Sequence, residues 1–184
     1  MKTYEITAAA ALASISAVLQ ILHIGWASPW GIWIDLVAVS WIVAYFLYGG
    51  RTALVVSIVG AIIITFSAPS TWLGALMKWI ATVPLIFTMM TFERLLKIKV
   101  KDYSKLRHGI VVVAVAMIIR GLITIPFNYY FAIPIWTGWS PAEAMVMIPW
   151  WVMFALNAIQ TIIEFSVAWL IVFRFKLSRF SVWE

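Results

Sequence analysis

Long apolar stretches fill almost the whole chain, and short turn-like segments such as Gly49-Gly50 and Gly138-Trp139-Ser140-Pro141 separate them. Most stretches are roughly 17 to 25 residues long, which is the length a helix needs to cross about 30 Å of hydrocarbon. The pattern predicts an all-α membrane protein that forms a single domain over residues 1–184. Six transmembrane helices are expected, over Ile6–Ile24, Ile32–Tyr48, Thr52–Ser67, Trp72–Leu95, His108–Phe131 and Ala144–Phe173.

Two of these regions have unusual lengths. The last stretch is longer than one crossing requires, so it either tilts in the bilayer or begins as a surface helix before Pro149. The second and third stretches are short, and a re-entrant element is the alternative to a full crossing there.

Positive charges lie almost entirely between these stretches. Of the 13 Lys and Arg residues, 11 fall in the N-terminus, the second and fourth loops and the C-terminal tail. They are Lys2, Arg51, Arg94, Lys97, Lys99, Lys101, Lys105, Arg107, Arg174, Lys176 and Arg179. The first, third and fifth loops hold none, so the positive-inside rule places both termini in the cytoplasm.

The composition agrees with a chain whose solvent is lipid. The hydrophobic fraction is 65% and the charged fraction is 11%, far from the average of soluble domains. We attribute the net charge of +6 to cytoplasmic loops that face anionic lipid and partner subunits, and not to nucleic-acid binding. The first stretch lacks the cleavage site of a secretory leader and is expected to be retained.

Several kinds of chemistry find no support in the sequence. The chain has no cysteine and no phosphate-binding G-x-x-x-x-G-K-[ST] loop. Its two histidines, His23 and His108, have no accompanying carboxylate cluster, so we expect no metal site. No acid, base and nucleophile are assembled, and we expect the protein not to be an enzyme.

Four ionisable residues lie well inside the apolar stretches, where a charge is costly and usually has a partner or a function. Arg120 and Glu164 lie at similar depths in the fifth and sixth stretches, and we expect them to pair. Asp35 and Lys78 both lie near the outer side and form a second expected pair. Either pair can be structural or can contact a ligand, and Lys78 and Glu164 are kept as candidate ligand-binding residues.

Polar side chains form two stripes that run toward the outer half of the membrane. The last stretch contributes Glu164, Gln160 and Asn157, followed outward by Phe154 and Trp150. The fifth stretch contributes Arg120, Thr124 and Asn128, each four residues from the next. Amide groups in a dry site suit a neutral ligand that carries donors and acceptors. Hydrogen bonding between the two helices is the alternative.

Aromatic and small residues mark two further surfaces. Eight of the 12 tryptophans fall near the outer side, which indicates either an interfacial belt or a mouth for a flat ligand. Ala9, Ala13 and Ala17 follow each other at intervals of four in the first stretch. Small residues at this spacing let another helix approach closely, either a partner subunit or a neighbour within the bundle.

These features resemble the substrate-binding S components of energy-coupling factor (ECF) vitamin transporters. The resemblance covers nearly the whole chain and includes the Ala9-Ala13-Ala17 face, Ile34-Asp35 with the later Tyr48-Gly49-Gly50, and the segment Gly74-Ala75-Leu76-Met77-Lys78-Trp79. It implies a multi-pass protein of a prokaryotic plasma membrane that binds a small-molecule vitamin. It also implies a transmembrane coupling subunit, docked on the alanine face, and two ATPase subunits as partners.

Within that family the chain is most similar to the riboflavin-specific members. Asn128 and Asn157 match the positions of their asparagines, while Gln160 stands where a Lys is expected. The resemblance implies that riboflavin or FMN is the transported ligand and that no resident cofactor is needed. A different vitamin of the pyridoxine, thiamine or queuosine-precursor type is the alternative within the family. A structural membrane protein without a ligand is the alternative outside it.

Overall fold

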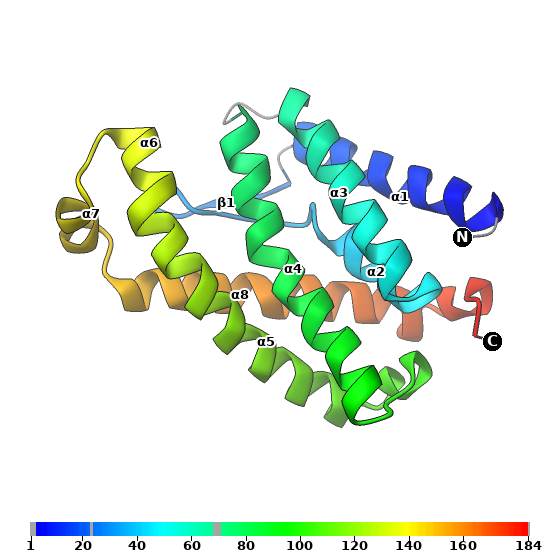
Figure 1. Ribbon diagram of the computed structural model, residues 1–184. Helices are drawn as coiled ribbons and strands as arrows, with labels where there is room; N and C mark the ends of the chain where they lie inside the picture. The colour runs from blue at the N-terminus through cyan, green and yellow to red at the C-terminus, as the bar shows by residue number, and fades with distance from the viewer. Residues whose placement is uncertain (1–2, 23, 68–70, 184) are drawn as a thin grey trace.

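Helices make up most of the chain in a computed structural model that describes residues 3–22, 24–67 and 71–183 (Figure 1). The helices are α1 (Thr3–Ile21), α2 (Val39–Tyr48), α3 (Gly50–Ser67), α4 (Thr71–Leu95), α5 (Leu106–Phe127), α6 (Ile133–Thr137), α7 (Pro141–Met147) and α8 (Trp150–Trp169). Shorter segments are β1 (Gly25–Ala27), β2 (Trp33–Asp35), η1 (Val100–Ser104), η2 (Asn128–Ala132), η3 (Leu170–Arg174) and η4 (Leu177–Phe180). Lys2 and His23 of the sequence analysis lie outside the described residues.

Four helical runs in the described part of the chain are long and apolar enough to cross a membrane. They are Thr3–Ile21, Trp72–Leu95, Leu106–Thr137 and Trp150–Arg174. Two more apolar helices, Val39–Tyr48 and Gly50–Phe66, are shorter. The structure thus supports a predominantly helical membrane protein. Helix α2, with 10 residues, is below the length of a full span, and α3, with 18 residues, is near the lower limit.

The segment before α2 differs from the prediction. A helix was expected from Ile32, but β2 is extended and pairs antiparallel with β1, with Gly25 opposite Asp35. Gly25 is required at this contact, since a Cβ there would lie 2.3 Å from the carbonyl oxygen of Ile34. Gly31 turns the chain between the strands with a φ of 77°. These turn residues and the β-branched Ile32 and Ile34 favour a hairpin, so the helix begins only at Val39.

The long last stretch begins as a separate short helix before Pro149, which is one of the two alternatives that its length suggested. Helix α7 ends at Met147, and α8 starts at Trp150 directly after Pro149. Ser140 starts α7 with a capping box, because its hydroxyl accepts from Glu143 N and its own N donates to Glu143 Oε2. The hydrogen bonds from Ser140 lower the pKa of the Glu143 carboxyl.

The fifth stretch is longer than expected. Helix α5 passes through Pro126 into the π-helical segment η2 and then into α6, which ends where Gly138 adopts a φ of 76°. A π-helical turn widens the helix locally and often occurs beside functional sites. Here it contains Asn128, one of the candidate ligand-binding residues.

The alanine face of α1 packs inside the molecule. Helix α1 lies against α3 and α2, and Ala9 and Ala13 are buried, Ala13 completely. Beside them the Ser16 hydroxyl is 2.6 Å from the Ser40 hydroxyl and accepts a hydrogen bond from Trp41 Nε1. The expected alternative, close packing between helices of this chain, is confirmed for Ala9 and Ala13, while Ala17 is partly exposed. Docking of a partner subunit on this face stays a prediction.

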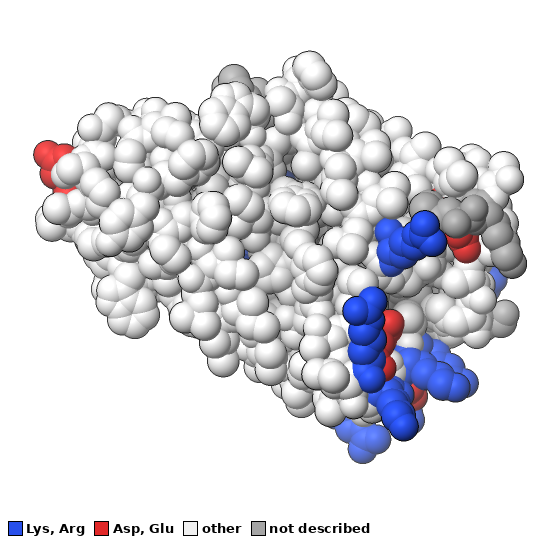
Figure 2. Space-filling view, viewed as in Figure 1, with Lys and Arg blue, Asp and Glu red and all other residues white. Residues whose placement is uncertain are grey.

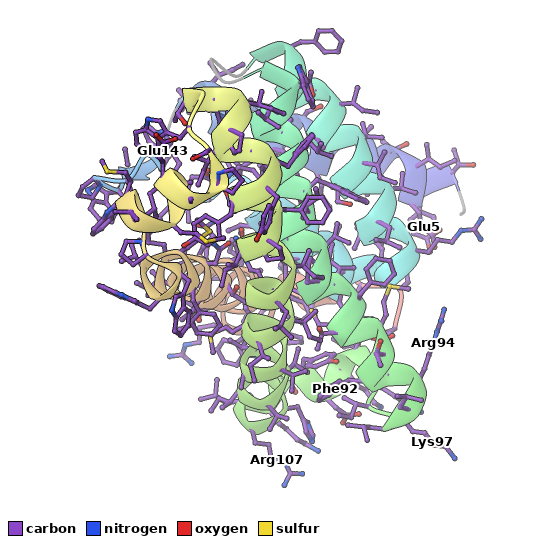
Figure 3. The ribbon with its side chains drawn as sticks, turned by 60° about the vertical axis from the view of Figure 1, so that its left-hand side comes forward. Glu5, Phe92, Arg94, Lys97, Arg107 and Glu143 are labelled. Atoms are coloured by element: carbon purple, nitrogen blue, oxygen red, sulfur yellow. The ribbon has the colours of Figure 1, made fainter. Side chains whose placement is uncertain are left out.

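Charge and chain ends gather at one end of the molecule. The two described termini lie at the same end (Figure 1), and Figure 2 shows Lys and Arg side chains concentrated there. Arg94, Lys97 and Arg107 point outward from this end in Figure 3, while Glu143, on α7, lies at the opposite end. We call the two regions the basic end and the α7 end.

Candidate functional site

A cavity of about 730 Å³ lies among α4, α5, α8 and the β1–β2 hairpin. Its lining comes from the N-terminal half of α4, the C-terminal part of α5 with η2 and α6, and residues 153–164 of α8. All of these are parts of the molecule distant from the basic end. The volume falls in the range of small-molecule sites, and the lining combines apolar residues with a few convergent polar groups.

Arg120 and Glu164 form the expected ion pair at the floor of this cavity. Arg120 Nη1 lies 2.9 Å from Glu164 Oε2, and the two residues are only 4% and 1% exposed. Arg120 also donates to Asn157 Oδ1 at 3.0 Å and to Thr161 Oγ1 at 3.2 Å. These contacts join α5 to α8 and satisfy most of the hydrogen-bond donors of the Arg120 guanidinium. A buried charge requires such partners.

The second expected pair is also present. Lys78 Nζ, from α4, donates to Asp35 Oδ2 at the end of β2. The other carboxylate oxygen of Asp35 accepts from Val37 N at 3.0 Å, so the side chain also holds the turn that leads into α2. Both residues line the cavity, and Lys78 retains donors that this pair does not use.

Gln160 connects the hairpin to the charged floor. Its Oε1 accepts from Asp35 N at 3.0 Å, and its Nε2 donates to Asp35 O at 2.8 Å. The same Nε2 donates to Glu164 Oε1 at 2.8 Å. The side chain therefore takes the place of a neighbouring strand for the backbone of β2. Extended backbone can exist at membrane depth only where such partners satisfy it.

Two polar groups of α5 point to an absent partner. The Thr124 hydroxyl is buried, lines the cavity and has no hydrogen-bond partner among the described residues. One turn further, Asn128 Nδ2 donates to Thr124 O at 2.7 Å, and no described residue donates to Asn128 Oδ1. A buried hydroxyl without a partner costs free energy, and a ligand that donates or accepts there would recover it.

Six of the eight candidate ligand-binding residues line the same cavity: Lys78, Thr124, Asn128, Asn157, Gln160 and Glu164. Phe154 and Trp150 do not line it. Phe154 packs on Gly121 of α5, where a Cβ would lie 2.5 Å from its ring. Trp150 is 62% exposed and lines a separate surface hollow with Tyr130.

An aromatic group borders the cavity away from its floor. Trp30 and Trp33 come from the hairpin, and Trp136 and Trp139 come from α6 and the turn after it. The distribution of tryptophan predicts such a mouth but does not distinguish these four from Trp26 or Trp72, which do not line the cavity. Gln20 and the hairpin tip around Pro29 also line the cavity and were not predicted; only the turn sequence at Pro29 gave a signal.

The described residues contain no group of three His, Cys, Asp or Glu side chains that could hold a metal ion. Comparison of the chain with protein-family models, with curated proteins and with solved structures finds no match.

Proposed function

We propose that this protein is a membrane-embedded, high-affinity binding subunit for riboflavin or a related flavin. In this proposal it belongs to the S-component type and delivers its ligand to an ATP-driven import complex, made of a coupling subunit and two ATPases in a prokaryotic plasma membrane. The observation that carries the proposal is the cavity, in which an aromatic border faces a floor of paired charges and an unpartnered Thr124 hydroxyl.

The charge balance of the floor favours a neutral ligand. Asp35 and Glu164 are matched by Lys78 and Arg120, so their formal charges sum to zero. A ligand with a net charge would enter a dry site without a counter-ion, which is costly. A neutral ring system with alternating donors and acceptors can instead use the free hydrogen-bonding groups of Thr124, Asn128 and Lys78. The faces of the tryptophan rings suit the flat surface of such a ligand.

The same pairing argues for binding and against catalysis. Each of the four ionisable groups at the floor is engaged by an opposite charge, and no described nucleophile with an adjacent base lines the cavity. A group held in an ion pair is poorly placed to exchange protons with a substrate. We therefore propose a protein that binds its ligand unchanged.

A different vitamin is the second candidate, and one observation favours it. Gln160 stands where the riboflavin-specific members are expected to carry a Lys, and its amide is occupied by Asp35 and Glu164. A ligand contact at this position would have to compete with those hydrogen bonds. Vitamins of the pyridoxine, thiamine or queuosine-precursor type are the compounds to compare with riboflavin.

We further propose six crossings with both termini in the cytoplasm. The common location of the two termini and the Lys and Arg residues supports this orientation. Helix α2 has 10 residues and rises about 15 Å, so it crosses only together with the extended segment from β2. The Gln160 contacts make such an interrupted crossing physically acceptable.

Single cysteines test this topology, because the chain has none of its own. Arg51→Cys, at the turn between α2 and α3, is expected to react with a membrane-impermeant maleimide only from the cytoplasmic side. Ala142→Cys, on α7, should react only from outside; both native residues are exposed. Labelling of both Arg51→Cys and Ala142→Cys from outside would mean that α2 and α3 form a re-entrant pair and that the chain crosses four times.

Thr124→Val tests the ligand site. Because the Thr124 hydroxyl has no partner among the described residues, its removal should leave the thermal unfolding temperature in detergent unchanged or slightly raised. Riboflavin affinity, measured by calorimetry, should fall by about 3- to 10-fold, the effect of one hydrogen bond.

Thr88→Val is the matched control, since this buried α4 hydroxyl donates to Pro84 O at 2.7 Å and does not line the cavity. It should leave riboflavin affinity as in the wild type. Unchanged affinity in Thr124→Val, with binding intact in the wild type, would remove Thr124 from the site.

A further inference from the structure

The basic end carries ten exposed cations. They are Arg51, Arg94, Lys97, Lys99, Lys101, Lys105, Arg107, Arg174, Lys176 and Arg179. Among the described residues their one ion pair is that of Lys105 with Asp102, at 3.8 Å. Most of this positive charge is thus left without a counter-ion within the described part of the chain, which calls for an anionic partner.

The loop that bears six of these cations, residues 94–107, is held in a fixed shape. Tyr103 is completely buried, and its hydroxyl donates to Met89 O at 3.2 Å. Trp169 Nε1 donates to Tyr103 O at 2.8 Å, which fastens the loop to α8. Burial, with Glu93 nearby, raises the pKa of the Tyr103 phenol, so it stays neutral. The lysines and arginines of this loop are therefore presented on an ordered turn and not on a flexible segment.

Large apolar side chains are exposed between the same cations. In the loop these are Leu95, Leu96 and Leu106, and in the tail they are Phe175 and Phe180. Only a few residues beyond Arg107, the exposed Ile110 and Val111 begin the apolar surface of α5. At about 1.5 Å per residue, Arg107 lies within one helical turn of this apolar surface. That is the depth at which lipid phosphates lie.

We propose that the loop 94–107 and the tail 174–180 form a binding surface for the phosphate groups of anionic phospholipids. The exposed Leu and Phe side chains insert between headgroups, while ammonium and guanidinium groups contact the phosphates. An acidic protein surface would neutralise the charge but would leave these leucines and phenylalanines facing a polar partner. Alternation of cationic and apolar residues, continuous with the lipid-facing surface of α5, favours a lipid leaflet.

The test compares two lipids on the full-length protein. Native mass spectrometry of the protein mixed with equal amounts of phosphatidylglycerol and phosphatidylcholine should show preferential retention of phosphatidylglycerol. The triple variant Lys97→Gln/Lys99→Gln/Lys101→Gln removes three exposed charges, each of which contributes about fivefold. Its preference for phosphatidylglycerol should fall by about 100-fold.

The variant Lys97→Arg/Lys99→Arg/Lys101→Arg is the matched control. It keeps the charge and should retain the lipid preference, and thermal unfolding should show that both triple variants are folded. Equal retention of the two lipids by the wild type would overturn the proposal and would leave an acidic protein as the partner. So would an undiminished preference in the glutamine variant. Neither measurement uses a vitamin, so the result is independent of the proposed function.

Discussion

Arg120→Met is expected to lower the free energy of unfolding by about 3–5 kcal/mol. The substitution leaves Glu164, which is 1% exposed, without its counter-ion in the interior. Gln160 Nε2 and Thr82 Oγ1 still donate to the carboxylate, but two neutral donors do not replace a guanidinium. Unfolding in mild detergent, followed by circular dichroism, measures the loss.

The double variant Arg120→Met/Glu164→Leu separates a lost charge partner from lost packing. Replacing both members of a buried pair by apolar residues is often neutral, so this variant should recover most of the stability of the wild type. Ligand binding should remain impaired in it, because the charged floor of the cavity is gone. A double variant as unstable as Arg120→Met would contradict the account of Arg120 and Glu164 as a pair.

Ala13→Trp is expected to prevent stable folding, with a loss of at least about 3 kcal/mol. Ala13 is completely buried where α1 packs on α3 and α2, and the indole has no space there. The matched variant is Ala10→Trp, on the exposed side of the same helix, which should fold as the wild type does. Yield and thermal unfolding of the two purified proteins make the comparison.

The same pair of variants decides between the two interpretations of the alanine face. Docking of a partner on Ala13 predicts that Ala13→Trp keeps ligand affinity and loses uptake. Internal packing predicts that both are lost together, because the protein does not fold. A well-folded Ala13→Trp protein with intact ligand affinity would favour the docking interpretation and contradict the packing of α1 described here.

The two ion pairs could be predicted from the sequence because a charge inside the membrane is energetically costly and because the depth of each residue can be counted along its span. A charge inside a membrane requires a partner, and counting residues along two spans placed Arg120 level with Glu164 and Asp35 level with Lys78. The polar stripe of α8 followed from helical periodicity in the same way, as far as Asn157. Such features depend on local spacing and on one strong energetic rule.

Other features depended on contacts that spacing does not encode. The hydrophobic run from Ile32 is equally compatible with a helix and with a buried strand, and periodicity cannot separate the two over a few residues. The role of Gln160 arises only because β2 lies beside α8 and needs backbone partners there. Similarly, small residues on α1 indicate a close neighbour, but only the packing of α3 and α2 identifies it.

A titration of ligand-free protein with riboflavin, followed by tryptophan fluorescence, tests the central claim most directly. Trp30, Trp33, Trp136 and Trp139 line the cavity, so a flavin bound there should quench strongly. We expect saturable quenching with one riboflavin per protein and competition by no more than a few related neutral compounds. An absence of quenching by riboflavin, and by the other candidate vitamins in the same assay, would contradict a ligand-binding role for this cavity.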